Sequence, residues 1–215
     1  MGRSIIFGDI HGCHEEWQDL MEKLAVTADD RLISVGDLIF KGPSTPKTLD
    51  LALRLPNLRC ILGNHEFYLL KDWKNNLLHT LTGYHAQAYD EMKSKFETYI
   101  QFIASWPFYL EEQDFIVVHA GLRPGIPLQQ QDPLDLTHLR NIGEENKPWF
   151  EYYEGTKPVI FGHWARRGLI VRSNAIGLDT GCVYGRQLTA VIFPSREIVS
   201  VKARKAYSPV LPKLD

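Results

Sequence analysis

The chain has 215 residues, of which 44% are hydrophobic, so it can bury a sizeable core and is expected to form one domain over residues 1–215. Its 24 basic and 26 acidic residues give a formal charge of -2, which excludes a general attraction to polyanions and leaves no strong case for nucleic-acid binding. The basic pair Arg166-Arg167 is expected to be ordinary solvated surface.

Three cysteines, Cys13, Cys60 and Cys182, include no close pair of the kind that binds zinc or undergoes redox cycling. Reduced thiols in the cytoplasm fit this pattern best. The N-terminus enters a strand-like run almost at once, so no secretory signal is expected. No apolar run approaches the roughly 18 residues that a membrane span needs, so no membrane association is expected.

The first part of the chain alternates short apolar runs with amphipathic segments. Strands are predicted at 4–7, 32–35 and 59–62, and helices at 15–25 and 44–55. The second helix opens with Ser-Thr-Pro, which is typical of a helix start. This β-α-β-α-β order predicts a largely parallel sheet with covering helices.

Residues 67–106 have a helical pattern that is rich in aromatic side chains, and Pro107 ends it. We interpret this segment as a helical insertion that covers the core, and one wall of a substrate cleft is the alternative. His79 and His85 lie here, but neither follows a strand that ends in glycine. Both are therefore expected to be surface or core histidines and not ligands.

From residue 108 onward short strands predominate, beginning at 115–118 and 158–161. Four further runs separated by turn residues predict an antiparallel meander, and they are 169–172, 175–178, 187–193 and 197–202. Two packed mixed β-sheets flanked by helices accommodate both halves of the chain. The expected fold class is therefore α/β, with mixed α+β character.

Potential metal ligands follow the predicted strands at the points where the strands end. Three early strands each end in glycine and lead to a ligand, and two later strands lead to histidine. Because open α/β sheets collect their ligands at the carboxyl ends of strands, these side chains are expected to converge. The six residues are Asp9, His11, Asp37, Asn64, His119 and His163.

The chemistry of this set indicates metal-dependent hydrolysis. Oxygen and imidazole ligands without cysteine suit manganese, iron or zinc better than calcium, and we expect two divalent cations, with Mn²⁺ preferred. A carboxylate such as Asp37 can bridge two cations. A metal pair about 3.5 to 4 Å apart lowers the pKa of a shared water and stabilises an in-line displacement, which indicates phosphoryl hydrolysis.

Five sequence blocks resemble the signatures of the calcineurin-like metallophosphoesterases, in particular the phosphoprotein phosphatase branch. These blocks are residues 8–12, 36–37, 63–66, 119–121 and 162–163. The resemblance implies a metallophosphoesterase-type sandwich with a shared bimetal site. In it, one metal is held by Asp9, His11 and Asp37, and the other by Asp37, Asn64, His119 and His163.

The same resemblance assigns roles around the metals. His65 is implied as the general acid. Arg140 is implied to grip the substrate phosphate together with Lys41 and Asn64, because a planar guanidinium suits a bidentate contact. The alternative for Arg140 is a surface charge on a helix.

Phe40-Lys41 departs from the Asp-Arg pair that the protein phosphatases have at this position. The aspartate that would orient His65 is missing, so His65 is expected to be a weaker proton donor. A phosphate leaving group, whose second pKa is about 6, needs a proton less than an alkoxide does. This departure favours phosphoanhydrides over phosphoserine or phosphothreonine.

A second resemblance, carried by residues 41–44, 161–165 and 177–189, is to the symmetrical diadenosine tetraphosphatases and their ApaH-like relatives. It implies that a metal-bridging hydroxide hydrolyses a small dinucleoside polyphosphate. A bacterial serine/threonine protein phosphatase that acts on phosphoproteins is the alternative, and a pyrophosphohydrolase of capped RNA or a silent metal-binding protein is less favoured. Asp179 is expected behind the ligands near His163, or as the cap of a turn.

Overall fold

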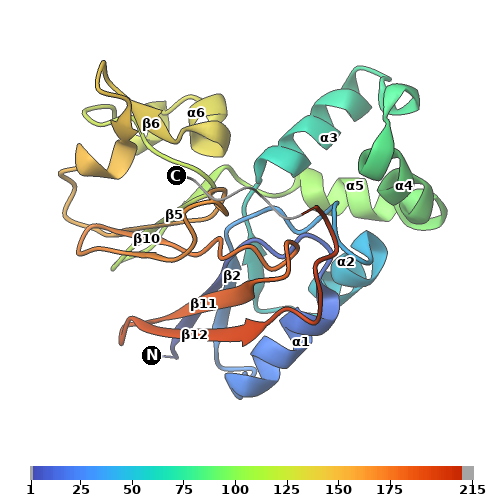
Figure 1. Ribbon diagram of the computed structural model, residues 1–215, viewed down its shortest axis with the longest axis horizontal. Coiled ribbons are helices and arrows are strands. Elements are labelled where there is room, and N and C mark those ends of the chain that lie inside the picture. Colours follow the sequence, from blue (N-terminus) through green and yellow to red (C-terminus); the bar gives the residue numbers. More distant parts are fainter. Residues whose placement is uncertain (1, 210–215) are drawn as a thin grey trace.

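The computed structural model describes residues 2–209 as two five-stranded mixed sheets that pack against each other, with helices outside them (Figure 1). The expected α/β architecture of two packed mixed sheets is confirmed. No helix among these residues has the length and apolar character needed to cross a membrane. The assignment of a single domain with an insertion at 67–106 stays a prediction.

The first sheet has the strand order β12-β11-β1-β2-β3. Its parallel part consists of β1 (Ser4–Phe7), β2 (Arg31–Ser34) and β3 (Leu58–Cys60), as the alternating pattern predicts. The antiparallel hairpin of β11 (Gln187–Phe193) and β12 (Glu197–Lys202) completes the sheet, with β11 paired to β1.

Helices α1 (His14–Lys23) and α2 (Thr45–Leu53) connect the parallel strands. The side chain of Ser44 caps α2 by accepting a hydrogen bond from the backbone N–H of Lys47, and Pro46 lies in the first turn. The helix therefore starts at the predicted Ser-Thr-Pro sequence.

The second sheet has the order β4-β5-β8-β10-β9. Its strands are β4 (Tyr109–Glu111), β5 (Ile116–Val118), β8 (Val159–Phe161), β9 (Ile170–Val171) and β10 (Ala175–Gly177). The predicted continuous meander is wrong. The buried strand β10 pairs in parallel with β8, whereas the β11-β12 hairpin joins the first sheet.

Alternating side chains divide the core into layers. Ile6, Val117 and Ile160 are completely buried between the two sheets. The next residue on each strand points the other way, so Phe7 packs with the helices and Phe161 packs on the outer face of the second sheet.

Two groups of elements lie apart from each other above the sheets (Figure 1). One group is helical and comprises α3 (Asn64–Lys74), α4 (Gly83–Met92) and α5 (Phe96–Ala104), with short 3-10 turns at Leu78–Thr80 and Lys93–Lys95. The other comprises α6 (Pro133–His138), β6 (Asn141–Ile142) and β7 (Lys147–Pro148), with 3-10 turns at Leu128–Gln130 and Trp149–Glu151.

Candidate active site

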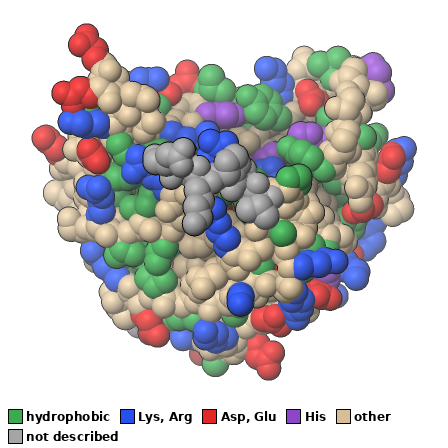
Figure 2. All heavy atoms as spheres, in the orientation of Figure 1, with side chains coloured by type: hydrophobic (Ala, Val, Ile, Leu, Met, Phe, Trp, Pro, Cys, Tyr) green, Lys and Arg blue, Asp and Glu red, His purple; other side chains and the backbone are tan. Residues whose placement is uncertain are grey.

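The strand ends deliver the predicted site residues to one cavity of about 570 Å³. All of them except His119 line this cavity, and His119 is completely buried beside it. Figure 2 shows histidine, lysine and arginine side chains beside the hollow at the upper edge of this face. The predicted site residues that lie on the cavity wall are Asp9, His11, Asp37, Lys41, Asn64, His65, Arg140, His163 and Asp179.

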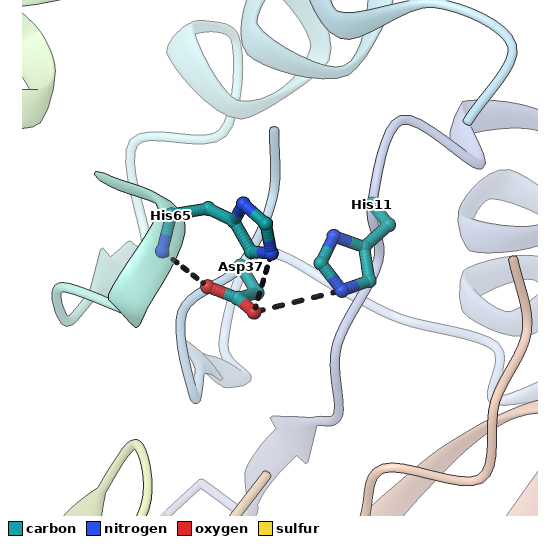
Figure 3. Close-up of side chains that lie close together, drawn as sticks. All are labelled: His11, Asp37 and His65. Carbon is teal, nitrogen blue, oxygen red and sulfur yellow. Dashed lines mark hydrogen bonds and ion pairs between the residues drawn. The ribbon is translucent and has the colours of Figure 1, made fainter. Parts of the chain in front are cut away.

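Asp37 lies at the centre of the cluster (Figure 3). Its Oδ2 atom is 3.5 Å from Nε2 of His11 and 3.5 Å from Nε2 of His119. The Nε2 atom of His65 lies 4.0 Å from the same oxygen, and the backbone N–H of His65 donates to Oδ1 at 3.1 Å. One carboxylate therefore faces three imidazoles.

The two imidazoles nearest to Asp37 have their other nitrogens engaged by backbone carbonyls. Nδ1 of His11 lies 3.1 Å from the carbonyl oxygen of Ile39, and Nδ1 of His119 lies 2.8 Å from that of Val35. A carbonyl can only accept, so both Nδ1 atoms carry the proton. Burial lowers the pKa of both side chains, which favours neutral rings whose Nε2 lone pairs point at the Asp37 carboxylate.

Asn64 contributes a further acceptor to the same point. Its Oδ1 atom is 3.0 Å from Nε2 of His119 and 2.9 Å from Nδ1 of His163. Because Nδ1 of His119 carries the proton, its Nε2 atom and Asn64 Oδ1 are two acceptors that a cation would satisfy, and this mixture of carboxylate, amide and imidazole ligands fits first-row divalent metals. The residues present therefore fit the divalent metals that they are predicted to bind.

Two buried carboxylates share this cluster. Ligand atoms of Asp9, Asp37 and His119 all lie within 4.8 Å of one another. Burial raises the pKa of Asp9, and the charges of Asp179 and Asp37 raise it further. Burial opposes ionisation of Asp37 too, but the surrounding histidines outweigh burial and hold its pKa below the ordinary value. A bound cation would stabilise both carboxylates in the ionised form.

Two glycines allow these loops to approach one another. The backbone N–H of His163 donates to both carboxylate oxygens of Asp9, at 3.2 and 3.1 Å, and a Cβ at Gly162 would collide with that carboxylate. Gly36 has a φ of +93°, and a Cβ there would lie 2.5 Å from the backbone nitrogen of Gly63. Both positions therefore require glycine.

Three of the predicted ligands have left-handed backbone conformations, which cost free energy in residues other than glycine. The φ angles are 47° at His11, 53° at Asp37 and 65° at His163. Such strain persists only where the surrounding structure holds it in place. The strand ends thus fix the direction of these side chains at an energetic cost, which is typical of functional sites.

Lys41 and Arg140, the two positively charged residues among the predicted phosphate contacts, lie at the edges of the cluster. Lys41 Nζ is 3.3 Å from Nε2 of His11, and Nη2 of Arg140 donates to the backbone carbonyl of His163 at 3.1 Å. Arg140 is exposed, as the alternative of a surface charge assumes, but it follows α6 (Pro133–His138) in a loop and does not lie on a helix, so its contact with the phosphate stays a prediction. Lys41 and Arg140 both line the cavity.

Aromatic rings enclose His65 on the side of position 40, where the protein phosphatases have an aspartate. The ring centroids of Phe40, His85 and Tyr84 lie 5.8, 5.7 and 6.2 Å from that of His65. Burial lowers the pKa of His65 to about 3. His85 is only partly exposed and packs on the site, which the sequence did not suggest. Helix α4 thus packs on the catalytic candidate, but none of residues 67–106 lines the cavity, so the alternative of a cleft wall stays a prediction.

Asp179 caps a turn, which is one of the two positions expected for it, and it also lies on the cavity wall. Its Oδ1 atom accepts a hydrogen bond from the backbone N–H of Gly181 at 3.2 Å, so it caps a turn. It also lines the cavity, and burial raises its pKa to about 6. Its negative charge helps to raise the pKa of Asp9, which places the two carboxylates in electrostatic contact.

Glu66 is an important residue that the sequence analysis missed. It is completely buried and accepts hydrogen bonds from four backbone N–H groups, at 2.8 to 3.3 Å. Burial and then the charge of Asp37 raise its pKa to about 8, against the effect of these donors. A glutamate three residues after the start of a helix is a known capping signal. The donors belong to Asp37, Leu38, Ile39 and Gly63.

Replacing Glu66 by glutamine is expected to lower the free energy of unfolding by at least about 2 kcal/mol, because the amide NH₂ would face two buried N–H donors. For a chain of this length that is a fall in Tm of about 4 to 8 °C. Thermal unfolding followed by circular dichroism measures it. The control is Glu22→Gln on the exposed face of α1, and equal Tm values for the two variants would contradict the role of Glu66.

Arg166 and Arg167 are exposed, as expected, but they are not ordinary surface. Both line the cavity, three and four residues after His163. The guanidinium of Arg167 lies 4.5 Å above the ring of Trp164, which is only 8% exposed. No pattern in the sequence separates this pair from other basic pairs.

Comparison with known proteins supports the resemblance described above. The calcineurin-like phosphoesterase family matches residues 2–190. The asymmetrical bis(5'-nucleosyl)-tetraphosphatase PrpE of Bacillus subtilis is 29% identical over 232 residues, which cover 94% of this chain and 95% of that protein. The protein of the same name from Oceanobacillus iheyensis is 28% identical over 94% of this chain and 93% of its own length.

Solved structures of related proteins support the same family resemblance. The crystal structure of a candidate diadenosine tetraphosphatase has a TM-score of 0.83 and 34% identity, over 94% of each chain. A serine/threonine phosphatase from Saccharomyces cerevisiae, with a TM-score of 0.64 and 16% identity over 100% of this chain and 82% of that one, shares the fold. The resemblance to tetraphosphatases is confirmed, although the named relatives are of the asymmetrical type. The chain is a metal-dependent hydrolase that belongs to the calcineurin-like phosphoesterase family.

Proposed function

We propose that the chain uses two divalent cations to hydrolyse a phosphoanhydride bond of dinucleoside polyphosphates. The observation that carries this proposal is the convergence of acceptors on Asp37. Neutral Nε2 atoms of His11 and His119 point at its Oδ2 atom from 3.5 Å, and no proton lies between them. Cations at this point would satisfy all three groups.

Asp37 is positioned to serve both cations. Around it lie Asp9 and His11, and also Asn64, His119 and His163. We assign the first two to one cation and the other three to the second, with Mn²⁺ preferred and Fe or Zn as alternatives. When bound, such a pair lowers the pKa of a water molecule and stabilises the charge that develops in an in-line displacement.

The remaining polar groups would bind and orient the phosphate. Lys41 contacts the side chain of His11, and Arg140 contacts the backbone of His163. Both positively charged side chains can therefore reach a phosphate that is bound at the cluster. Asn64 would also contact it through the amide group. Fixed positive charge beside the reacting phosphorus stabilises the transition state more than the ground state.

The environment of His65 supports an anhydride substrate. A pKa of about 3, lowered by burial, means that the imidazole of His65 is neutral near pH 7 and donates a proton poorly. Expulsion of a nucleoside phosphate requires little proton donation, whereas expulsion of the serine alkoxide requires much. The relatives named tetraphosphatases support the same substrate class, and a phosphoprotein is the second candidate. A nucleotide substrate suits the cytoplasmic location that the three free thiols also favour.

Steady-state rates test this proposal. With Mn²⁺ present, kcat/KM for diadenosine tetraphosphate is expected to exceed that for a phosphoserine peptide by at least about tenfold, because the alkoxide is the poorer leaving group. Metal analysis of the reconstituted protein is expected to find two ions per chain. Faster cleavage of the peptide would favour the phosphatase alternative, and a metal-loaded protein without turnover of either substrate would contradict the proposal.

A further inference from the structure

Four cationic side chains line the cavity without a carboxylate partner. They are Lys41, Arg140, Arg166 and Arg167, and none of them has an ion pair within residues 2–209. Elsewhere on the chain, six other arginines each face a carboxylate within 4.0 Å. Those six are Arg3, Arg31, Arg59, Arg123, Arg172 and Arg204. Three arginines outside the cavity, Arg54, Arg186 and Arg196, also have no ion pair in the described part of the chain, so the four cavity residues are distinguished by gathering on one wall.

The like charges in this group lie close together. Lys41, Arg140, Arg166 and Arg167 share one cavity wall with Asp9, Asp37 and Asp179. Divalent cations bound at Asp9 and Asp37 would offset those carboxylates and leave the four positive side chains to repel one another. A bound polyanion would relieve this repulsion, and the arrangement is therefore suited to more than one phosphate.

The loop that carries the arginine pair is held in place. Trp164 is buried, and its ring centroid lies 6.3 Å from that of Phe150. The guanidinium of Arg167 lies 4.5 Å from the Trp164 ring. The carbonyl of Ala165 accepts a hydrogen bond from Nη1 of Arg186 at 2.8 Å. The two guanidinium groups therefore belong to a supported loop, which limits the entropy lost on binding.

Arg166 and Arg167 differ from the other two cations in what they contact. Lys41 and Arg140 bond to predicted metal ligands, whereas neither member of the pair has a hydrogen bond to one within the described chain. A cavity of about 570 Å³ is far larger than one phosphate requires and lies in the usual range for whole small-molecule ligands. There is room for a substrate that extends from the metals to the pair.

We propose that Arg166 and Arg167 form a subsite for the phosphates of the substrate that are not being attacked. This inference rests on the proposed hydrolysis of polyphosphates and adds that the enzyme senses phosphate-chain length. The ligand class is a linear polyphosphate, whose oxygens match the forked donors of two guanidinium groups. A monophosphate ester would engage only Lys41 and Arg140.

The double variant Arg166→Ala/Arg167→Ala tests the subsite by inhibition and by kinetics. Tripolyphosphate is expected to inhibit the variant at least about tenfold more weakly than the wild type, since a charge-assisted hydrogen bond to each arginine is lost. The KM for diadenosine tetraphosphate is expected to rise by a similar factor, with a smaller change in kcat. Hydrolysis of p-nitrophenyl phosphate is expected to change only about two- to threefold, because screened charges contribute little.

The matched control is Arg172→Ala. Arg172 is also exposed and also stacks on an aromatic ring, 4.9 Å from that of Phe150, but it lies outside the cavity. The variant Arg166→Lys/Arg167→Lys keeps the charge without the forked donors and is expected to fall between the wild type and the alanine variant. Equal losses on tripolyphosphate and p-nitrophenyl phosphate, or no loss on either, would overturn the subsite. Failure of the wild type to hydrolyse any phosphate ester with Mn²⁺ would instead reject the proposed function.

Discussion

Replacing Asp37 by asparagine is expected to lower kcat/KM by at least about a thousandfold on every substrate. The carboxylate faces His11 and His119 from 3.5 Å, and in the proposed function it binds both cations. Asparagine has the same shape but no charge, and the charge stabilisation supplied by a metal pair is worth several kcal/mol. About 4 kcal/mol corresponds to the expected thousandfold loss.

Metal content and rate should fall together in this variant. Metal analysis is expected to find fewer than two ions per chain in Asp37→Asn, while circular dichroism shows an unchanged fold, since asparagine keeps the Oδ1 acceptor for the His65 N–H. Asp114→Asn is the control, because Asp114 is exposed and does not belong to the cavity wall. An Asp37→Asn protein that binds two ions and retains a tenth of the activity would refute the central role of this carboxylate.

Replacing His65 by alanine is expected to separate the two candidate substrate classes. General acid catalysis contributes about 10² to 10⁴-fold where the leaving group is poor, so a phosphoserine peptide should lose at least about a hundredfold. Diadenosine tetraphosphate should lose about tenfold or less. The physical reason for the difference is the leaving group, because a serine alkoxide needs a proton to depart and a nucleoside phosphate needs one much less.

A series of aryl phosphates measures this effect directly. If His65 donates a proton, the rate of His65→Ala should depend more steeply on the pKa of the leaving phenol than the rate of the wild type does. His79→Ala is the control, because His79 is exposed and lies outside the cavity. An equal loss across the whole series would mean that His65 orients the phosphate and does not protonate the leaving group.

Local patterns were sufficient to predict the strand ends and the residues that follow them. Asp9, Asp37 and His163 each come after an apolar run and a glycine, and parallel strands bring such positions to one edge. The structure places all of them within one cluster. The part of the site that depends on strand direction and on turn residues can therefore be predicted from the sequence alone.

Contacts between distant segments could not be predicted in this way. His85 reaches His65 because helix α4 folds back over the site, and no periodicity specifies that arrangement. Arg166 faces the cavity because the loop after His163 turns inward. The division of the late strands between two sheets has the same origin, since pairing partners such as β1 and β11 are about 180 residues apart in sequence.

The aromatic enclosure of His65 bears on how this protein could be redesigned. Phe40 stands edge-on to both His65 and His85 and is only 2% exposed. A single exchange of Phe40 for aspartate, meant to recreate the acidic partner of the protein phosphatases, would bury a carboxylate among ring edges at a large desolvation cost. An acidic partner for His65 would require helix α4 to be rebuilt together with position 40, so this feature cannot be introduced by one substitution.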